Sequence, residues 1–552
     1  MTSGTNNKRL IGVLAGSAAF ALVLAGCQTG GDDGGDSGGG GESIIVGTTD
    51  TVISLDPAGS YDNGSLSLQT QVFGHLLNTV PGDAEVVPDL AESAEFTSET
   101  EYTVKLKPGL KWANGNDLTA SDVAFSFDRQ VAIADDNGPS VLLYNLESTE
   151  AVDDTTVVFH LIAGNDQIFP QILTSQAGII VDEDTFLPDA VTPDDDIVKA
   201  NAFSGQYVIT SYDFNNLVSL EANPEYGGAL GEPKTKNIDL KYYTDSSNLK
   251  LDVQEGNIDV AYRSLSATDV ADLEGNDDVT VTKGPGGEIR YITFNFNIQP
   301  FGAETPEADP AKALAVRQAV ANLVDREAIA DEVYKGTYLP LYSYVPDGFV
   351  GATQALKDEY GDGNGGPDAE AAAAVLEAAG ITTPVALNLQ YNPDHYGESS
   401  GDEYAQVKSQ LEADGLFTVN LQSTEWVTYQ NERKNTYPVF QMGWFPDYAD
   451  ADNYLTPFFI PTPDQDGNLI GGGFLQNRYE NPEVTALINA QAVELDPEVR
   501  KSDIEEVQTL LAQDLPTIPL LQGAQIAVTG SAVTGATLDG SFKFRFATLV
   551  KG

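Results

Sequence analysis

Cysteine, histidine and basic side chains are scarce in this chain of 552 residues. The only cysteine is Cys27, so no intramolecular disulfide can form, and stability must come from a large core. The histidines are His75, His160 and His395, and neither they nor the lone cysteine form a cluster with metal-ligand spacing. We therefore predict no metal site and no cofactor.

The charge balance is strongly acidic, because 83 Asp and Glu face only 28 Lys and Arg and give a formal charge of -55. A nucleic-acid partner is excluded, since phosphate binding needs basic patches. The surplus of acid is typical of a strongly solvated surface, and it could also attract cationic ligands. It does not define the function.

Sequence patterns of enzymes are also missing. The chain contains no Gly-x-Ser-x-Gly and no glycine-rich phosphate loop, and Cys27 is better explained by its position near the N-terminus. Acidic runs such as 194–196 could serve glycoside hydrolysis, but with 83 acids such runs arise by chance. We predict that the protein is not an enzyme.

The N-terminus is typical of a secreted, lipid-anchored protein. Lys8 and Arg9 precede an apolar stretch over 10–24 that is too short to span a bilayer. Leu24-Ala25-Gly26-Cys27 resembles the bacterial lipobox, in which the cysteine is acylated and becomes the mature N-terminus. We predict a signal peptide over 1–26 and a lipid-anchored flexible linker over 27–42, rich in Gly and Asp, with a reach of roughly 20 Å.

The rest of the chain has the pattern of an α/β protein, without a later run of eighteen apolar residues. Strands are predicted over 101–107, 155–161, 206–212, 217–222, 238–243, 385–391 and 417–421. Thr119, Asp309, Asn481 and Asp496 are predicted to cap helices, and two further helices are predicted over 369–379 and 403–414. Helices alternate with strands mainly after residue 290.

Three motifs carry a family resemblance. They are Ser54-Leu55-Asp56-Pro57-Ala58; the run from Leu106-Lys107-Pro108-Gly109 through Trp112, Leu118-Thr119-Ala120 and Asp122-Val123 to Phe127; and Gly443-Trp444-Phe445-Pro446-Asp447-Tyr448 continuing to Asn453. In this order they resemble the peptide-type (family 5) extracellular solute-binding proteins of ABC importers. The resemblance implies an α/β, two-lobed, class II periplasmic-binding-protein fold with an extra domain inserted in the N-terminal lobe.

The resemblance also implies a domain division. Lobe I would comprise 43–82, 206–288 and 519–552; the inserted subdomain would be 84–205; and lobe II would be 290–515. The composition shift near residue 290 agrees with the start of lobe II. The ligand would be enclosed between the lobes, where hinge closure follows binding.

Candidate ligand-binding residues follow from the late motif. In peptide-binding relatives an Asp at the position of Asp447 receives the peptide's α-ammonium, and the backbone of Gly443 and Phe445 pairs with an extended peptide. Trp444 and Trp426 match aromatic positions near side-chain pockets. Arg433 matches an Arg that meets a ligand carboxylate, although the spacing from Arg433 to Trp444 is one residue short. His395 is the candidate if the ligand is a metal complex.

The sequence therefore predicts a monomeric solute-binding lipoprotein on the extracellular face of the cell membrane, or in the periplasm where an outer membrane exists. It would capture a solute, a short peptide being favoured, and deliver it to an ABC permease. Two alternatives stay open. One is a receptor for an oligosaccharide or a metal complex, which would depend more on Trp444 and Trp426 than on Asp447. The other is a tethered extracellular sensor.

Overall fold

A computed structural model describes residues 43–83, 85–263, 265–397, 399–463 and 467–552. The predicted signal peptide, Cys27 and the linker lie outside the described residues. The described residues form one compact unit.

The main sheet of the described chain contains eleven strands. In spatial order they are β15 (Phe417–Ser423), β14 (Val385–Tyr391), β16 (Val439–Trp444), β12 (Val279–Phe294), β19 (Thr517–Gly530), β11 (Val260–Tyr262), β1 (Ile44–Thr48), β10 (Asn237–Tyr242), β9 (Leu217–Ala222) and β8 (Tyr207–Asp213), while β13 (Tyr338–Pro340) pairs with β19. Parallel pairs (β1 with β10, β14 with β15) and antiparallel pairs (β8 with β9, β12 with β19) occur together, so the sheet is mixed.

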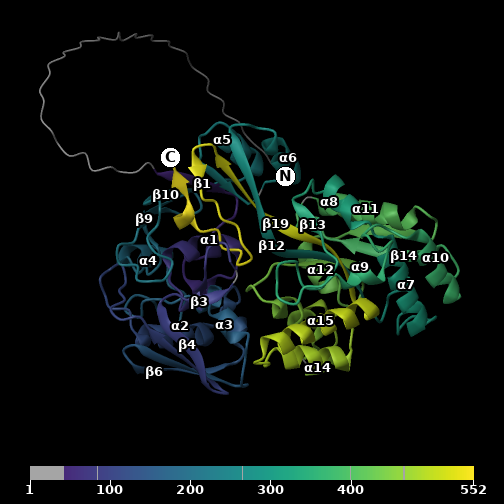
Figure 1. The fold of residues 1–552 in the computed structure, drawn as a ribbon, viewed down its shortest axis with the longest axis horizontal. Helices are drawn as coiled ribbons and strands as arrows, with labels where there is room; N and C mark the ends of the chain where they lie inside the picture. Colours follow the sequence, from purple (N-terminus) through teal and green to yellow (C-terminus); the bar gives the residue numbers. More distant parts are fainter. Residues whose placement is uncertain (1–42, 84, 264, 398, 464–466) are drawn as a thin grey trace, which may run out of the picture. The chain divides into compact units, whose positions relative to one another are not determined.

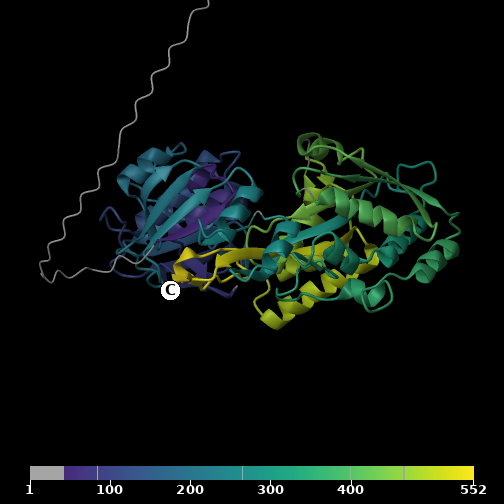
Figure 2. The ribbon, with the colours of Figure 1, turned by 90° about the horizontal axis from the view of Figure 1, so that it is seen from above.

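Strands β12 and β19 are the long crossing strands of this sheet. They pair antiparallel from Val279 opposite Gly530 to Thr293 opposite Thr517, and the register shifts between Pro285 and Ile289. Figure 1 shows the two strands side by side, and in Figure 2 the yellow β19 runs from the purple and blue strands into the green part of the fold. Outside their mutual pairing, β19 pairs with β11 at Ala527–Thr529, and β12 pairs with β16 at Ile289–Phe294.

A separate four-stranded sheet belongs to the segment that the sequence predicts to be inserted. Its order is β4 (Ala91–Ser98), β5 (Glu101–Leu106), β7 (Thr156–Leu161) and β6 (Leu146–Asp153). Two-stranded sheets pair β2 (Leu77–Thr79) with β3 (Val86–Pro88), β17 (Thr462–Pro463) with β18 (Leu469–Ile470), and β20 (Val533–Thr534) with β21 (Val550–Lys551).

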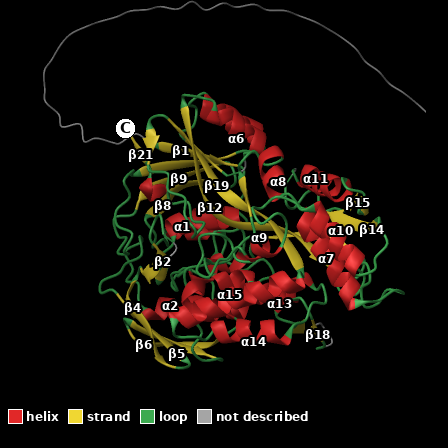
Figure 3. Ribbon diagram, turned by 45° about the vertical axis from the view of Figure 1, so that its right-hand side comes forward, coloured by secondary structure: helices red, strands yellow, loops and turns green. Residues whose placement is uncertain are grey.

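Helices cover these sheets and are shown in red in Figure 3. They are α1 (Asn63–Val72), α2 (Ala120–Ile133), α3 (Phe169–Ile172), α4 (Asp194–Ala200), α5 (Ser246–Gln254), α6 (Ala267–Glu274), α7 (Pro310–Leu323), α8 (Arg326–Glu332), α9 (Ala355–Glu359), α10 (Ala369–Ala378), α11 (Ser400–Glu412), α12 (Trp426–Glu432), α13 (Thr456–Phe459), α14 (Pro482–Gln491) and α15 (Pro497–Asp514). Thr119 caps α2 in a capping box with Asp122, and Asp309 caps α7, as predicted. The helix predicted from residue 403 begins earlier, at Ser400.

Hydrophobic packing divides the described chain into separate cores. The largest joins residues between Ile289 and Leu521, a second joins Ile44–Phe73 to Ile179–Tyr262 and to Ala527–Leu549, and a third joins residues between Leu76 and Ile180 to Tyr448. Several residues that the sequence assigns to the inserted subdomain thus pack with the lobe I core, namely Ile179, Val181, Phe186, Ile197, Ala202 and Phe203. The α/β two-lobed fold is confirmed, whereas the exact domain limits stay a prediction.

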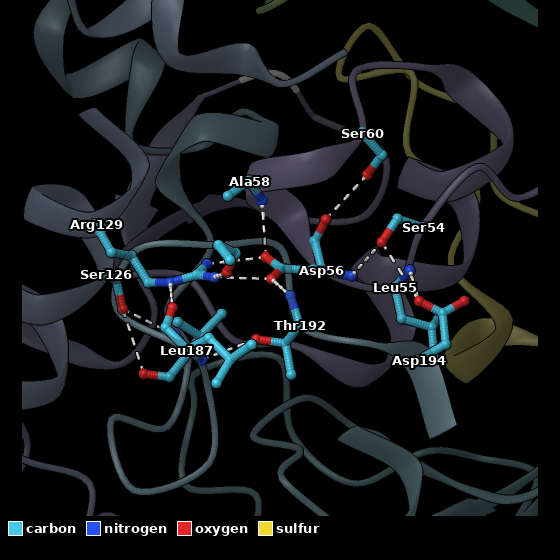
Figure 4. Close-up of polar contacts among 12 residues, drawn as sticks. Ser54, Leu55, Asp56, Ala58, Ser60, Ser126, Arg129, Leu187, Thr192 and Asp194 are labelled. Carbon is cyan, nitrogen blue, oxygen red and sulfur yellow. Dashed lines mark hydrogen bonds and ion pairs between the residues drawn. The ribbon is translucent and has the colours of Figure 1, made fainter. Parts of the chain in front are cut away.

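The first family motif has a structural role in the fold. Asp56 is fully buried, and its two carboxylate oxygens accept hydrogen bonds from Nη1 and Nη2 of Arg129 on α2 at 2.9 and 2.8 Å (Figure 4). The backbone N–H groups of Ala58 and Thr192 donate to the same carboxylate at 3.0 and 2.7 Å. All four groups that contact the carboxylate therefore donate to it, so the buried charge is compensated.

Asp194 has a similar structural role. One of its oxygens accepts from the backbone N–H of Leu55 at 2.9 Å, and the other accepts from the Tyr212 hydroxyl at 2.7 Å (Figure 4 shows the Leu55 contact). This acid comes from the run over 194–196 that the sequence offered as a weak hydrolytic candidate. In the fold it fixes the loop before the Asp56 motif.

Candidate functional site: two cavities at the crossing strands

The larger of two adjoining cavities at the crossing strands has a volume of about 350 Å³ and is called the aromatic cavity below. It is lined by Tyr61, Asp62, Asn63, Leu66 and Gln176 from the N-terminal part of the chain, and by His395, Tyr396, Trp426, Gly443, Trp444, Phe445, Pro446, Asp447 and Phe474 from lobe II. Its walls thus come from both sides of the crossing strands. Five of the six predicted binding residues meet here.

Asp447 is held by partners from both sides of this cavity. The Tyr61 hydroxyl donates to Oδ1 of Asp447, and the side-chain amide of Asn453 donates to Oδ2 at 3.0 Å. Asn453 in turn accepts the backbone N–H of Asp447 and the indole N–H of Trp444 through its own oxygen, each at 2.9 Å. The late motif therefore fixes both the carboxylate and the neighbouring indole.

Electrostatics in the aromatic cavity favour a cationic group. Burial raises the pKa of Asp447, and the hydrogen bonds from Tyr61 and Asn453 oppose that shift. Burial also raises the pKa of Asp62, a second carboxylate in the lining. Among the described residues that line this cavity there is no Lys or Arg. A cation placed here would meet carboxylates and no positive side chain.

Aromatic rings supply most of the remaining wall. His395 stacks on Trp426 with ring centroids 3.7 Å apart and the planes only 5° from parallel. Tyr396 and Phe445 flank this pair, with Phe445 centred 6.2 Å from His395. Burial and the positive charge of Arg290 lower the pKa of His395 to about 4, so the imidazole is neutral near pH 7. Flat or apolar side chains suit such a wall.

The strand that enters the late motif has one uncovered stretch. β14 pairs with β16 only at Val439 and Phe440, so beyond Phe440 this edge of β16 has no strand partner among the described residues. The Gly443 carbonyl on that edge accepts a hydrogen bond from the Tyr396 hydroxyl at 3.3 Å. A side chain at 443 would meet the Ile289 carbonyl oxygen at 2.8 Å, so only glycine fits. Main-chain pairing by a ligand stays a prediction.

Arg433 lies apart from the other predicted residues. Its side chain is 2% exposed and does not line the aromatic cavity. Nη1 and Nη2 donate to the carbonyl oxygens of Leu475 and Phe474 at 2.6 and 2.9 Å, and Nε donates to Gln430 at 2.6 Å. The guanidinium thus stabilises the short helix Gly473–Leu475 through its backbone carbonyls. The predicted contact of Arg433 with a ligand carboxylate has no support in this geometry.

The smaller cavity, of about 200 Å³, lies at the crossing itself and is called the hinge cavity. Gly286–Glu288 of β12 and Gly523–Ile526 of β19 line it together with Arg263, Tyr338 and Phe542. It shares Asn63, Phe445 and Pro446 with the aromatic cavity, so the two adjoin. Apart from Phe445, none of the residues that line the hinge cavity was predicted from the sequence to bind ligand.

Comparison with known proteins decides the family. The bacterial extracellular solute-binding proteins, family 5 (middle region), match residues 85–466, which is more than half of the chain. The chain belongs to this family. Its members are solute-binding components of transport systems, found outside the cell or in the periplasm. Among the described residues of this family 5 protein, no helix is long and apolar enough to cross a membrane.

Individual relatives are distant but match over nearly the full length. The oligopeptide-binding protein OppA of Bacillus subtilis is 22% identical, covering 96% of each chain. Heme-binding protein A of Haemophilus influenzae is 24% identical over 94% of this chain and 95% of the relative. The crystal structure of the ABC transporter substrate-binding protein CtaP from Listeria monocytogenes superposes with a TM-score of 0.76 at 24% identity, covering 93% of this chain and all of the other. The last comparison supports the fold of this family 5 protein.

Proposed function

We propose that this protein captures short peptides in the aromatic cavity, with the peptide's α-ammonium on Asp447, and delivers them to the membrane permease of an ABC importer. The observation that carries the proposal is the Asp447 carboxylate, which is half-buried and held by Asn453 in a cavity whose described lining residues include no basic side chain. A charge-assisted hydrogen bond is strong in such a place. The relative named for oligopeptides supports the same ligand class.

The Tyr61 contact fits a capture mechanism. Tyr61 stands on the lobe I side and donates to Asp447 of lobe II, so this pair joins the two sides of the cavity. An incoming ammonium group would take the place of the Tyr61 hydroxyl on Oδ1. The ligand must stabilise the closed arrangement better than this single contact does, because only differential affinity shifts a conformational equilibrium.

The N-terminal anchor completes the proposal. Cys27, acylated, would keep the receptor at the extracellular face of the membrane, and the linker over 27–42 would let it reach the permease. Retention beside the permease raises the local concentration of loaded receptor.

A second candidate ligand is a flat ring system, such as the haem for which one relative is named. The parallel stack of His395 on Trp426 favours it, because a further ring can add to an exposed stacking face. In that case binding would depend on Trp426 and not on Asp447.

The test compares the peptide affinity of Asp447→Ala with that of the unaltered protein, using pools of random tripeptides with free or acetylated N-termini. Native mass spectrometry first identifies the peptides that bind, and calorimetry then measures the affinity for one captured sequence. We expect Asp447→Ala to weaken binding of free-amine peptides roughly 10- to 100-fold and to leave acetylated peptides nearly unchanged. Asp347→Asn is the control, since burial also raises the pKa of this carboxylate but it lies outside the cavity. Equal losses for both pools would rule out the proposed role of Asp447.

A further inference from the structure

The hinge cavity holds one basic side chain, Arg263, within the described lining. Nε of Arg263 lies 3.1 Å from Oδ2 of Asp50, and the side chain is 33% exposed. Among the described residues, none forms a hydrogen bond or ion pair with Nη1 or Nη2 of Arg263. The guanidinium is therefore oriented by one anchor and keeps a donor edge for another group.

The backbone at Arg263 is unusual. The residue directly follows β11 and has a φ of 59°, in the left-handed region that non-glycine side chains rarely adopt. Its N–H donates to the Ile526 carbonyl of β19 at 3.1 Å, which fixes this bend against a crossing strand. Strain of this kind persists where the surrounding structure imposes it, and it gathers at ligand sites.

The other charges around the hinge cavity are already compensated. Glu288 lines it, but its carboxylate pairs with Arg290, which is 3% exposed. Arg290 also donates to the Tyr396 carbonyl at 2.6 Å and to the Tyr338 hydroxyl at 3.1 Å. Glu288 thus pairs directly with Arg290, and its charge also acts on Arg263 through space, as the charge of Asp50 does.

The two adjoining cavities therefore differ in charge. The aromatic cavity carries Asp62 and Asp447 without a basic residue in its described lining, whereas the hinge cavity carries Arg263 together with Glu288, whose carboxylate pairs with Arg290. Asn63 and Phe445 form part of the wall of both, so a ligand can extend from one into the other past them. A short molecule with a positive group at one end and a carboxylate at the other matches this arrangement.

Building on the proposed function, we propose that Arg263 receives the C-terminal carboxylate of the bound peptide in the hinge cavity, the place that the sequence assigned to Arg433. A guanidinium fork binds a carboxylate through two parallel hydrogen bonds. Because the cavity is walled by β12 and β19, the carboxylate also contacts the strands about which the lobes move. The ligand class is thus a short peptide with both termini free.

The experiment measures the affinity of tripeptides with a free C-terminus and of their C-terminal amides, using pools by native mass spectrometry and a captured sequence by calorimetry. Amidation is expected to weaken binding to the unaltered protein roughly 10- to 100-fold. Arg263→Met should cause a similar loss for the free acid and almost none for the amide, and Arg263→Lys should restore part of the affinity.

Lys283→Met is the matched control. Lys283 lies on β12, is 31% exposed and pairs with Glu274 at 2.8 Å, but lines neither cavity. Circular dichroism checks that each variant is folded, and the amidation comparison needs no variant at all. Equal binding of acid and amide by the unaltered protein would overturn the assignment of Arg263 while leaving the peptide function intact. Failure to bind any tripeptide would instead refute the proposed function itself.

Discussion

Removing Asp56 should destabilise the protein severely, although Asp56 lies in a family motif and touches neither cavity. Asp56 and Arg129 are 0% and 3% exposed, and the pair is bidentate. Asp56→Ala leaves a buried guanidinium without its counter-charge, which costs about 3–5 kcal/mol. It also removes the acceptor for the N–H groups of Ala58 and Thr192.

The measurement is urea unfolding followed by circular dichroism and by tryptophan fluorescence, since Trp112 is fully buried in the core beside α2. At an m value of about 3 kcal/mol per M, the expected loss lowers the midpoint by about 1 M or more. Removing both partners, as Asp56→Ala with Arg129→Met, should cost much less than the sum of the two single changes, because neither charge is then left alone.

The control is Asp117→Ala, which removes an exposed ion pair with Lys111 and should leave the midpoint nearly unchanged. Strict additivity of the two single changes, or a cost for Asp56→Ala below about 1 kcal/mol, would refute the view that this pair is a coupled, buried structural element.

Two further predictions concern pH and anchoring. Burial raises the pKa of Glu403 to about 7 from an ordinary 4.5, while Arg290 and the Tyr334 hydroxyl oppose the shift. Between these two pH values the native state therefore holds a proton that the unfolded state has lost. The free energy of unfolding should fall by about 3 kcal/mol as the pH rises from about 4.5 to about 7. Glu403→Gln should flatten that decline in urea unfolding at a series of pH values, and an unchanged slope would contradict it. Cys27→Ser should leave peptide affinity unaltered and release the protein from the membrane fraction into the medium, whereas membrane retention of this variant would argue against acylation at Cys27.

Local chemistry explains which parts of the fold the sequence could predict. The caps at Thr119 and Asp309 depend on residues within four positions of each other, so the sequence displays them directly. The crossing strand β12 is harder to predict, because Gly286 and Gly287 interrupt its alternation at the register shift. The helix α11 begins three residues before its predicted start. Ser399, the residue before the helix, makes no side-chain cap, so no capping pattern in the sequence indicates this start.

The site was predictable only on one side. Asp447, Trp444 and Trp426 belong to or lie near a motif, and the structure brings them together. Tyr61 and Arg263 come from lobe I, and nothing near them in sequence points to a ligand, since their relation to Asp447 exists only in the folded chain. Arg433 was predicted to bind ligand because it matches an Arg of the relatives. In the structure its guanidinium donates to the backbone carbonyls of Leu475 and Phe474, and the residue type alone could not indicate this.

The hydroxyl of Tyr61 on Asp447 means that an ammonium group bound by this carboxylate would compete with a side chain of the protein itself. Under the proposed function, a solute gains the carboxylate only by displacing this phenol, so the phenol sets a threshold that every ligand meets. A ligand that offers an ammonium group is expected to exceed the threshold, because a charge-assisted hydrogen bond is stronger than one from a neutral hydroxyl. Selectivity for the charged end of a ligand would then be set by the protein's own side chain, while the rings around it tolerate variety in the rest.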